Sequence, residues 1–190
     1  MARLFVAVDS PPEVKRALEE LIGRLRETRA EVRWEHASKL HLTVKFLGET
    51  PEALVPGIDS ALGGIAAQVS PLVVRYRAVG CFPGAKRPRV IWVGMEDQTG
   101  ELIRLQRLLE DSMERLGVER EEREFHPHVT LGRVKGEKNL HVLRGMLESV
   151  TFERGPVQIR ELLLVKSDLQ PSGSVYTILK TYPFVGNSHT

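Results

Sequence analysis

Two short segments in distant parts of the chain repeat one pattern of side chains. His41-Leu42-Thr43-Val44 and His128-Val129-Thr130-Leu131 both read histidine, apolar, threonine, apolar, and each stands within an apolar run typical of a strand. Successive side chains of a strand point to opposite faces, so the histidine and the threonine project together while the apolar residues project behind them. The fold must therefore contain two strands that each bury one face and present an imidazole and a hydroxyl on the other.

The rest of the pattern predicts an α+β protein. Apolar residues at steps of three and four predict helices over residues 11–29, 51–68, 102–116 and 140–150. Apolar or alternating runs predict strands at residues 4–8, 32–34, 40–47, 72–79, 90–93, 125–134, 157–168 and 175–184, and Pro171-Ser172-Gly173 predicts the turn of a closing hairpin. Several strands follow one another directly, which favours mainly antiparallel sheets over a doubly wound parallel sheet.

Composition excludes several classes of protein. The formal net charge of +2 does not fit a protein that coats nucleic acid through a large basic field, so an acidic substrate has to be held locally. The single cysteine, Cys81, forms no internal disulfide and supplies no cysteine-rich zinc site, and a buried or incidental thiol is the favoured interpretation. No apolar run is long enough to cross a bilayer and the first residues lack the pattern of a signal peptide, so we expect a cytoplasmic protein. We also expect it to be a monomer.

The two motifs suit chemistry on a phosphodiester. Displacement at phosphorus requires one proton to be taken from the attacking oxygen and another to be given to the leaving oxygen. Imidazole titrates near neutrality, with an unperturbed pKa of about 6.5, so two histidines can perform both transfers. The hydroxyls of Thr43 and Thr130 can donate to the nonbridging phosphate oxygens. Two such strands facing each other would surround a small anion.

At nearly every point the chain resembles the 2H phosphoesterase superfamily, and within it the RNA 2′,3′-cyclic phosphodiesterases, historically called 2′-5′ RNA ligases. The two HXTX motifs carry the resemblance, and further similar segments are Arg3–Ala7, Phe82–Gly94, Phe125–Arg133 and Leu164–Tyr176. The resemblance implies one bilobal catalytic domain over residues 1–190, with two lobes related by a pseudo-twofold axis, sheets facing a central cleft and helices outside. It also implies metal-independent hydrolysis of a 2′,3′-cyclic phosphate to a 2′-phosphate, without a cofactor.

The family also suggests individual roles. By resemblance, His41 is the proton donor and His128 the proton acceptor, Thr43 and Thr130 bind the phosphate, and Arg133 supplies a fixed positive charge beside it. From the residues alone the two histidines are equivalent. Weak reverse chemistry, which joins RNA ends through a 2′–5′ linkage, is consistent with the same catalyst.

Several side chains have a second interpretation. Arg133 fits a surface salt bridge nearly as well as a phosphate site. Lys45 shares the strand parity of His41, which places it either in solvent at the rim of the cleft or on the phosphate. Four aromatic residues can stack a base, although core packing is the better default for each: Trp34, Phe46, Trp92 and Phe125.

Other functions also remain open. A related enzyme could act on small cyclic nucleotides or on 2′–5′ oligonucleotides, and a protein of another class could bind RNA ends without turnover. His126 and His128, one residue apart, could instead chelate a metal ion, although the neighbouring sequence does not complete a ligand set. These alternatives differ in substrate length, in the formation of product and in sensitivity to chelators.

Overall fold

The computed structural model describes residues 1–171 and 173–186 and has four α-helices in that part of the chain. Their bounds are α1, Pro12–Arg26; α2, Val55–Ala66; α3, Glu101–Arg115; and α4, Leu140–Ser149. Short 3₁₀ turns, η1 (Ala37–Lys39) and η2 (Glu52–Leu54), precede β3 and α2. All four predicted helices are confirmed, and none in the described part of the chain is long and apolar enough to cross a membrane.

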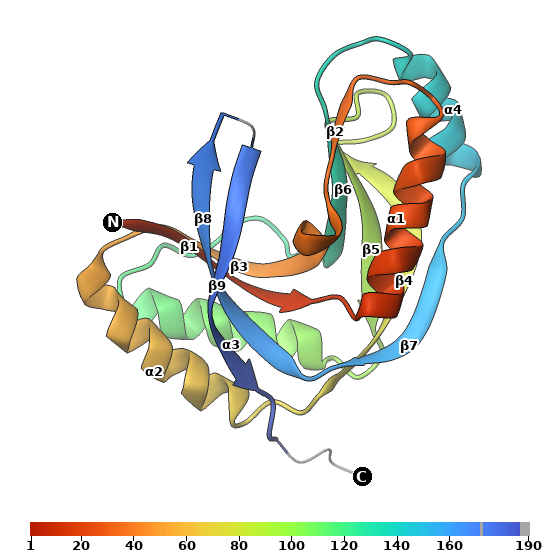
Figure 1. Cartoon of the computed structure of the whole chain (residues 1–190). Helices are drawn as coiled ribbons and strands as arrows, with labels where there is room; N and C mark the ends of the chain where they lie inside the picture. The colour runs from red at the N-terminus through yellow and green to blue at the C-terminus, as the bar shows by residue number, and fades with distance from the viewer. Residues whose placement is uncertain (172, 187–190) are drawn as a thin grey trace.

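Two antiparallel sheets face each other (Figure 1). The four-stranded sheet has the order β3-β1-β8-β9, with bounds β1, Ala2–Asp9; β3, His41–Thr50; β8, Glu161–Gln170; and β9, Gly173–Pro183. The five-stranded sheet has the order β2-β6-β5-β4-β7, with bounds β2, Val32–Trp34; β6, His128–Val134; β5, Val90–Asp97; β4, Leu72–Phe82; and β7, Glu153–Ile159. Every one of these strand pairs is antiparallel, so the predicted α+β class with two antiparallel sheets is confirmed.

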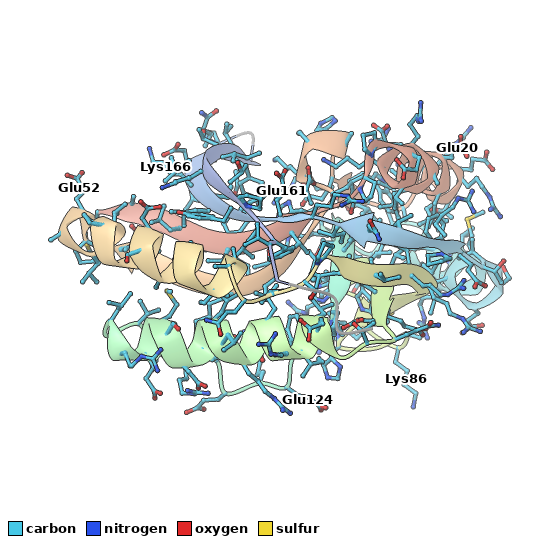
Figure 2. The ribbon with its side chains drawn as sticks, turned by 90° about the horizontal axis from the view of Figure 1, so that it is seen from below. Glu20, Glu52, Lys86, Glu124, Glu161 and Lys166 are labelled. Carbon is cyan, nitrogen blue, oxygen red and sulfur yellow. The ribbon has the colours of Figure 1, made fainter. Side chains whose placement is uncertain are left out.

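The helices cover the outer sides of the sheets. Figure 1 shows α2 and α3 below the four-stranded sheet and α1 and α4 beside the five-stranded sheet. Figure 2 shows α2 and α3 side by side, with charged side chains such as Glu52 and Lys86 pointing away from the body of the protein. The predicted stripe on α1 is buried as expected, and the chain leaves α3 at Gly117, whose φ of +85° fits the left-handed turn that commonly closes a helix.

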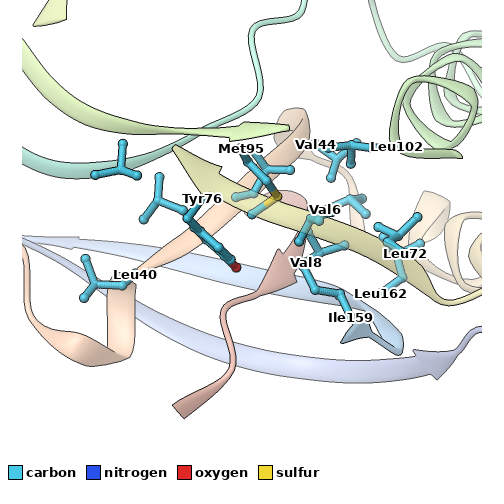
Figure 3. Packing of buried hydrophobic residues seen from close by; sticks show 14 of the residues in the cluster. Val6, Val8, Leu40, Val44, Leu72, Tyr76, Met95, Leu102, Ile159 and Leu162 are labelled. Carbon is cyan, nitrogen blue, oxygen red and sulfur yellow. The ribbon is translucent and has the colours of Figure 1, made fainter. Parts of the chain in front are cut away.

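One continuous hydrophobic core joins the two sheets. Figure 3 shows Val6 and Val8 of β1 and Leu162 of β8 packed beside Leu72 of β4 and Ile159 of β7, and all five side chains are buried. A smaller cluster of buried residues lies on the opposite face of the four-stranded sheet and consists of Phe5, Ala7, Leu163 and Val165. β1 therefore buries both of its faces, which accounts for its unbroken apolar sequence.

The prediction of one strand over residues 157–168 is wrong. The chain forms β7 and β8 there, and β7 pairs with β4 in one sheet while β8 pairs with β1 in the other. Only Arg160 separates the two strands, and neither glycine nor proline marks the place where the chain crosses between the sheets, so the sequence reads as one strand. The closing hairpin is confirmed by the pairing of Gln170 with Gly173, whereas Ser172 of its turn lies outside the described residues.

Candidate functional site

The two motifs lie on neighbouring strands of different sheets. β3 and β6 contact each other where the sheets meet. On β3, His41 and Thr43 are half-buried and the residue between them is buried, and on β6 the same pattern holds for His128 and Thr130. Neither threonine hydroxyl has a hydrogen bond to any described side chain or backbone group, so both remain available to a ligand.

Both motifs end in a β-bulge at the same position. On β3, Thr43 pairs with Ala7 of β1 and Lys45 with Val6, so Val44 has no partner on β1. On β6 the ladder with β5 likewise skips Leu131. An extra residue in a strand reverses the face on which the following side chains project. The two half-sites therefore share a local backbone irregularity as well as their residues.

The bulges decide where the next side chains point. Lys45 faces the core, only 4% exposed, so the prediction that it lies at the cleft rim or on the phosphate is wrong. Its ammonium group donates to Glu110 Oε2 and to the carbonyl of Glu119, both at 2.7 Å. Phe46 and Arg133, which occupy equivalent positions two residues beyond the bulges, are exposed on the cleft side.

His41 lies in an aromatic surround. Its ring stacks on Phe5 at a centroid distance of 5.2 Å and meets the edge of Tyr176 at 5.4 Å. Desolvation by these neighbours lowers the pKa of His41 to about 4, although the carboxylate of Asp9 opposes the shift and the ammonium of Lys15 adds to it. The imidazole of the unliganded protein is therefore neutral at physiological pH.

His128 lies in a comparable surround on the other sheet. Phe82 meets its ring edge-on at 5.0 Å, and Trp92 lies at a centroid distance of 6.4 Å. Its Nδ1 lies 2.6 Å from the carbonyl oxygen of His126. Because a carbonyl only accepts, Nδ1 carries the hydrogen, which leaves Nε2 of the neutral ring with a free lone pair. Burial lowers the pKa of His128, although the bond to His126 opposes that shift.

The aromatic predictions have a mixed outcome. Trp34 and Phe125 pack against the main core, as the default predicted. Phe46 does not, because the bulge leaves it 60% exposed, and Trp92 is half-buried beside His128. The aromatic residues that surround the histidines, Phe5, Tyr176 and Phe82, were not predicted as part of the site. Phe5 could have been inferred, because side chains alternate along β1 and Phe5 lies on the face opposite Leu4 and Val6, which belong to the main core.

A cavity of about 300 Å³ adjoins His41. Phe5 and Tyr176, which contact His41, form part of its wall, and Arg133 reaches it from β6. Arg133 has no ion pair with any described residue, so its alternative interpretation as a surface salt bridge is not supported. The remaining residues that line the cavity are Arg3, Leu4, Arg33, Glu35, Lys39, Phe46, Ser167 and Ser174.

His126 and His128 do not form part of a metal-binding cluster in the described residues. His126 is largely exposed, and its Nε2 lies 3.7 Å from Glu124 Oε2, the one acidic group paired with it in the described part of the chain. No group of three histidine, cysteine or acidic side chains within residues 1–171 and 173–186 converges closely enough to hold a metal ion. The chemistry available at the site is that of two imidazoles, two hydroxyls and an arginine.

Comparison with known proteins agrees with this constellation. Residues 8–92 and 93–176 each match the family model described as LigT like Phosphoesterase, and each stretch contains one motif. A relative from Methanothermobacter thermautotrophicus, named RNA 2′,3′-cyclic phosphodiesterase, is 32% identical over 95% of this chain and 97% of its own length. A relative of the same name from Thermus thermophilus is 34% identical over 97% and 91%, respectively.

Solved structures give the same result. The crystal structure of TT0787 of Thermus thermophilus superposes with a TM-score of 0.83 at 30% identity, covering 98% of this chain and all of that one. The crystal structure of E. coli LigT complexed with 3′-AMP superposes with a TM-score of 0.76 at 26% identity, covering 96% and 98%. With the paired motifs, the two facing sheets and these matches in agreement, the chain belongs to the LigT-like phosphoesterases of the 2H superfamily.

Proposed function

We propose that this protein hydrolyses the 2′,3′-cyclic phosphate at the end of RNA or of a nucleotide to a 2′-phosphate, with His41 as proton donor and His128 as proton acceptor. The observation that carries the proposal is the pair of half-buried histidines on adjoining strands, each with a threonine hydroxyl on the same face that bonds to no described residue. The names of the relatives support the choice of substrate.

The reaction requires no metal ion and no cofactor. Nε2 of His128 takes a proton from water as the water oxygen bonds to phosphorus. The bond between phosphorus and O3′ breaks, and the imidazolium of His41 gives its proton to O3′, which leaves a 2′-phosphate and a 3′-hydroxyl. Thr43, Thr130 and Arg133 stabilise the charge on the nonbridging oxygens. A 5′-hydroxyl in place of water would give a 2′–5′ linkage by the same steps.

The electrostatics support this division of roles. The hydrogen bond from Nδ1 of His128 to a backbone carbonyl leaves Nε2 as the basic atom of a neutral ring. His41 has no such bond to a described residue, and the nearby Asp9 favours its charged form. Its low pKa in the unliganded protein must rise for it to act as an acid, and a bound phosphate anion next to the ring supplies that change.

The test is turnover by alanine variants of each histidine. His41→Ala and His128→Ala should each lower kcat/KM on an RNA with a 2′,3′-cyclic phosphate end by about 10²–10⁴, because each removes one proton transfer. His141→Ala, at an exposed position on α4, is the matched control and should retain full activity. Full activity in either of the first two variants would overturn the proposal, and tight RNA binding by a wild-type protein without turnover would indicate a binding protein instead.

A further inference from the structure

The cavity beside His41 is too strongly cationic to be explained by the reacting phosphate alone. Its wall carries four cationic side chains, Arg3, Arg33, Lys39 and Arg133, and one carboxylate, Glu35. The whole chain has a formal net charge of only +2. This part of the surface therefore concentrates net positive charge, which the chain as a whole nearly lacks, and such a concentration is typical of a local anion site.

Most of these cations have no counter-charge among the described residues. Arg33 of β2 and Arg133 of β6 are direct partners in the strand register, a like-charged arrangement that destabilises a sheet in the absence of an anion. Within the described residues, the arginines at the cavity have no ion pair, and Lys39 has only a contact of 4.0 Å with Glu35. Their charge is therefore available to a bound group.

These cations come from separate elements that meet at one place. Arg3 lies on β1, Arg33 on β2 and Lys39 in η1, and the β8–β9 hairpin closes the cavity with Tyr176 and Ser174. In Figure 1 this hairpin stands opposite β2 and β6, and β3 runs below them. The ammonium of Lys39 lies 5.4 Å from the centre of the Tyr176 ring, which fixes it over the aromatic wall.

The cavity is a neighbour of the reaction centre and not the centre itself. The residues that line it include neither histidine and neither threonine of the two motifs. The rings of Phe5 and Tyr176 contact His41 and also form the cavity wall, so a group in the cavity lies beside the reacting phosphate. Exposed Phe46, 5.9 Å from Phe5 between ring centroids, adds an aromatic surface on which a base can stack.

We propose that this cavity binds the phosphodiester on the 5′ side of the terminal nucleotide, so that an RNA chain is preferred over a mononucleotide. The inference rests on the proposed function. An RNA that ends in a cyclic phosphate carries its next negative charge on that phosphodiester, whereas a nucleoside 2′,3′-cyclic phosphate with a free 5′-hydroxyl has no second anion. Guanidinium groups bind phosphate oxygens through paired hydrogen bonds, and Arg3 and Arg33 are positioned to supply them.

The test compares kcat/KM for three substrates at one ionic strength: uridine 2′,3′-cyclic phosphate, the dinucleotide UpU with a 2′,3′-cyclic phosphate end, and the same dinucleotide with a neutral methylphosphonate linkage. The wild-type protein should favour the charged dinucleotide over both other substrates by about tenfold or more, since hydrogen bonds to charged groups contribute that much. A large preference for both dinucleotides would indicate base stacking alone and would overturn the assignment of a phosphate site.

Arg33→Gln assigns the effect to the cavity. This variant should lower the preference for the charged dinucleotide by about tenfold. It should leave unchanged the ratio of kcat/KM between the other two substrates, which carry the cyclic phosphate but no second anion. Folding should tolerate it, because Arg33 is exposed and its loss removes the opposition to Arg133. Arg107→Gln, at an exposed position on α3, is the matched control. An undiminished preference in Arg33→Gln would refute the inference, whereas no turnover of any substrate by the wild type would refute the proposed function.

Discussion

Lys45 provides the sharpest test of how the first motif is supported. Its side chain and that of Glu110 are 3% and 5% exposed, and the ammonium nitrogen lies 2.7 Å from Glu110 Oε2. Glu110 also accepts from the backbone N–H of Glu121, and Lys45 donates to the carbonyl of Glu119, so the pair ties β3 and α3 to the segment that leads to the second motif. Removal of one partner leaves an uncompensated buried charge.

Lys45→Met should lower the free energy of unfolding by roughly 3–5 kcal/mol, the typical cost of breaking a buried ion pair from one side. In a domain of this size that corresponds to a fall in Tm of about 6–20 °C. The double variant Lys45→Met with Glu110→Leu removes both charges and should recover most of the loss, because a buried pair and apolar residues of similar volume are often nearly equivalent.

The assay is urea unfolding followed by fluorescence and circular dichroism, with both single variants and the double variant compared in a thermodynamic cycle. Coincident transitions would justify a two-state treatment. A loss below about 1 kcal/mol in Lys45→Met, or a double variant no more stable than the single one, would show that the pair is not the buried support described above.

Two further predictions concern the histidines and their surround. Burial lowers the pKa of His41 to about 4 and also lowers that of His128, so kcat/KM should be highest at a pH below about 6.5 and fall above it. The value of kcat reports the complex with the anion bound and should fall only at higher pH. A kcat/KM that rises from pH 6.5 to 8 would contradict the assignment. In Gly80→Ala the new methyl group would lie 2.4 Å from Trp92 Cζ2, so the indole beside His128 has to move and activity should fall. The control Gly145→Ala, in α4, meets no atom within 4 Å and should add up to about 1 kcal/mol of stability with activity unchanged. Equal activities of these two variants, assayed where both are fully folded, would refute the link between that indole and the histidine.

The sequence predicted the helices and strands correctly wherever the spacing of apolar residues corresponds to one buried face of the element. The apolar stripe of α1 and the two strands with histidine and threonine follow the alternation expected, and their pairing on one cleft was predicted because the motifs are equivalent. The antiparallel class also followed from strands that succeed one another without a helix. These features depend on local chemistry that recurs along the chain.

Simple alternation failed at the bulges and at the junction between the sheets. A bulge at Val44 reverses the face on which the following side chains project, which buries Lys45 and exposes Phe46. No residue type in this segment indicates a bulge. The position of the bulge is determined by how β3 pairs with β1, and that pairing joins residues far apart in the sequence. The cations of the cavity could not be grouped from sequence either, because Arg3 and Arg33 lie on strands of different sheets.

The most direct measurement is the identity of the product formed from a short RNA that ends in a 2′,3′-cyclic phosphate, incubated with the protein in excess EDTA and analysed by ³¹P NMR. The proposed mechanism predicts a 2′-phosphate, formed at the same rate with and without the chelator and about 10²–10⁴ times more slowly in His41→Ala and in His128→Ala. A 3′-phosphate, a reaction stopped by EDTA, or an unchanged cyclic end would contradict it.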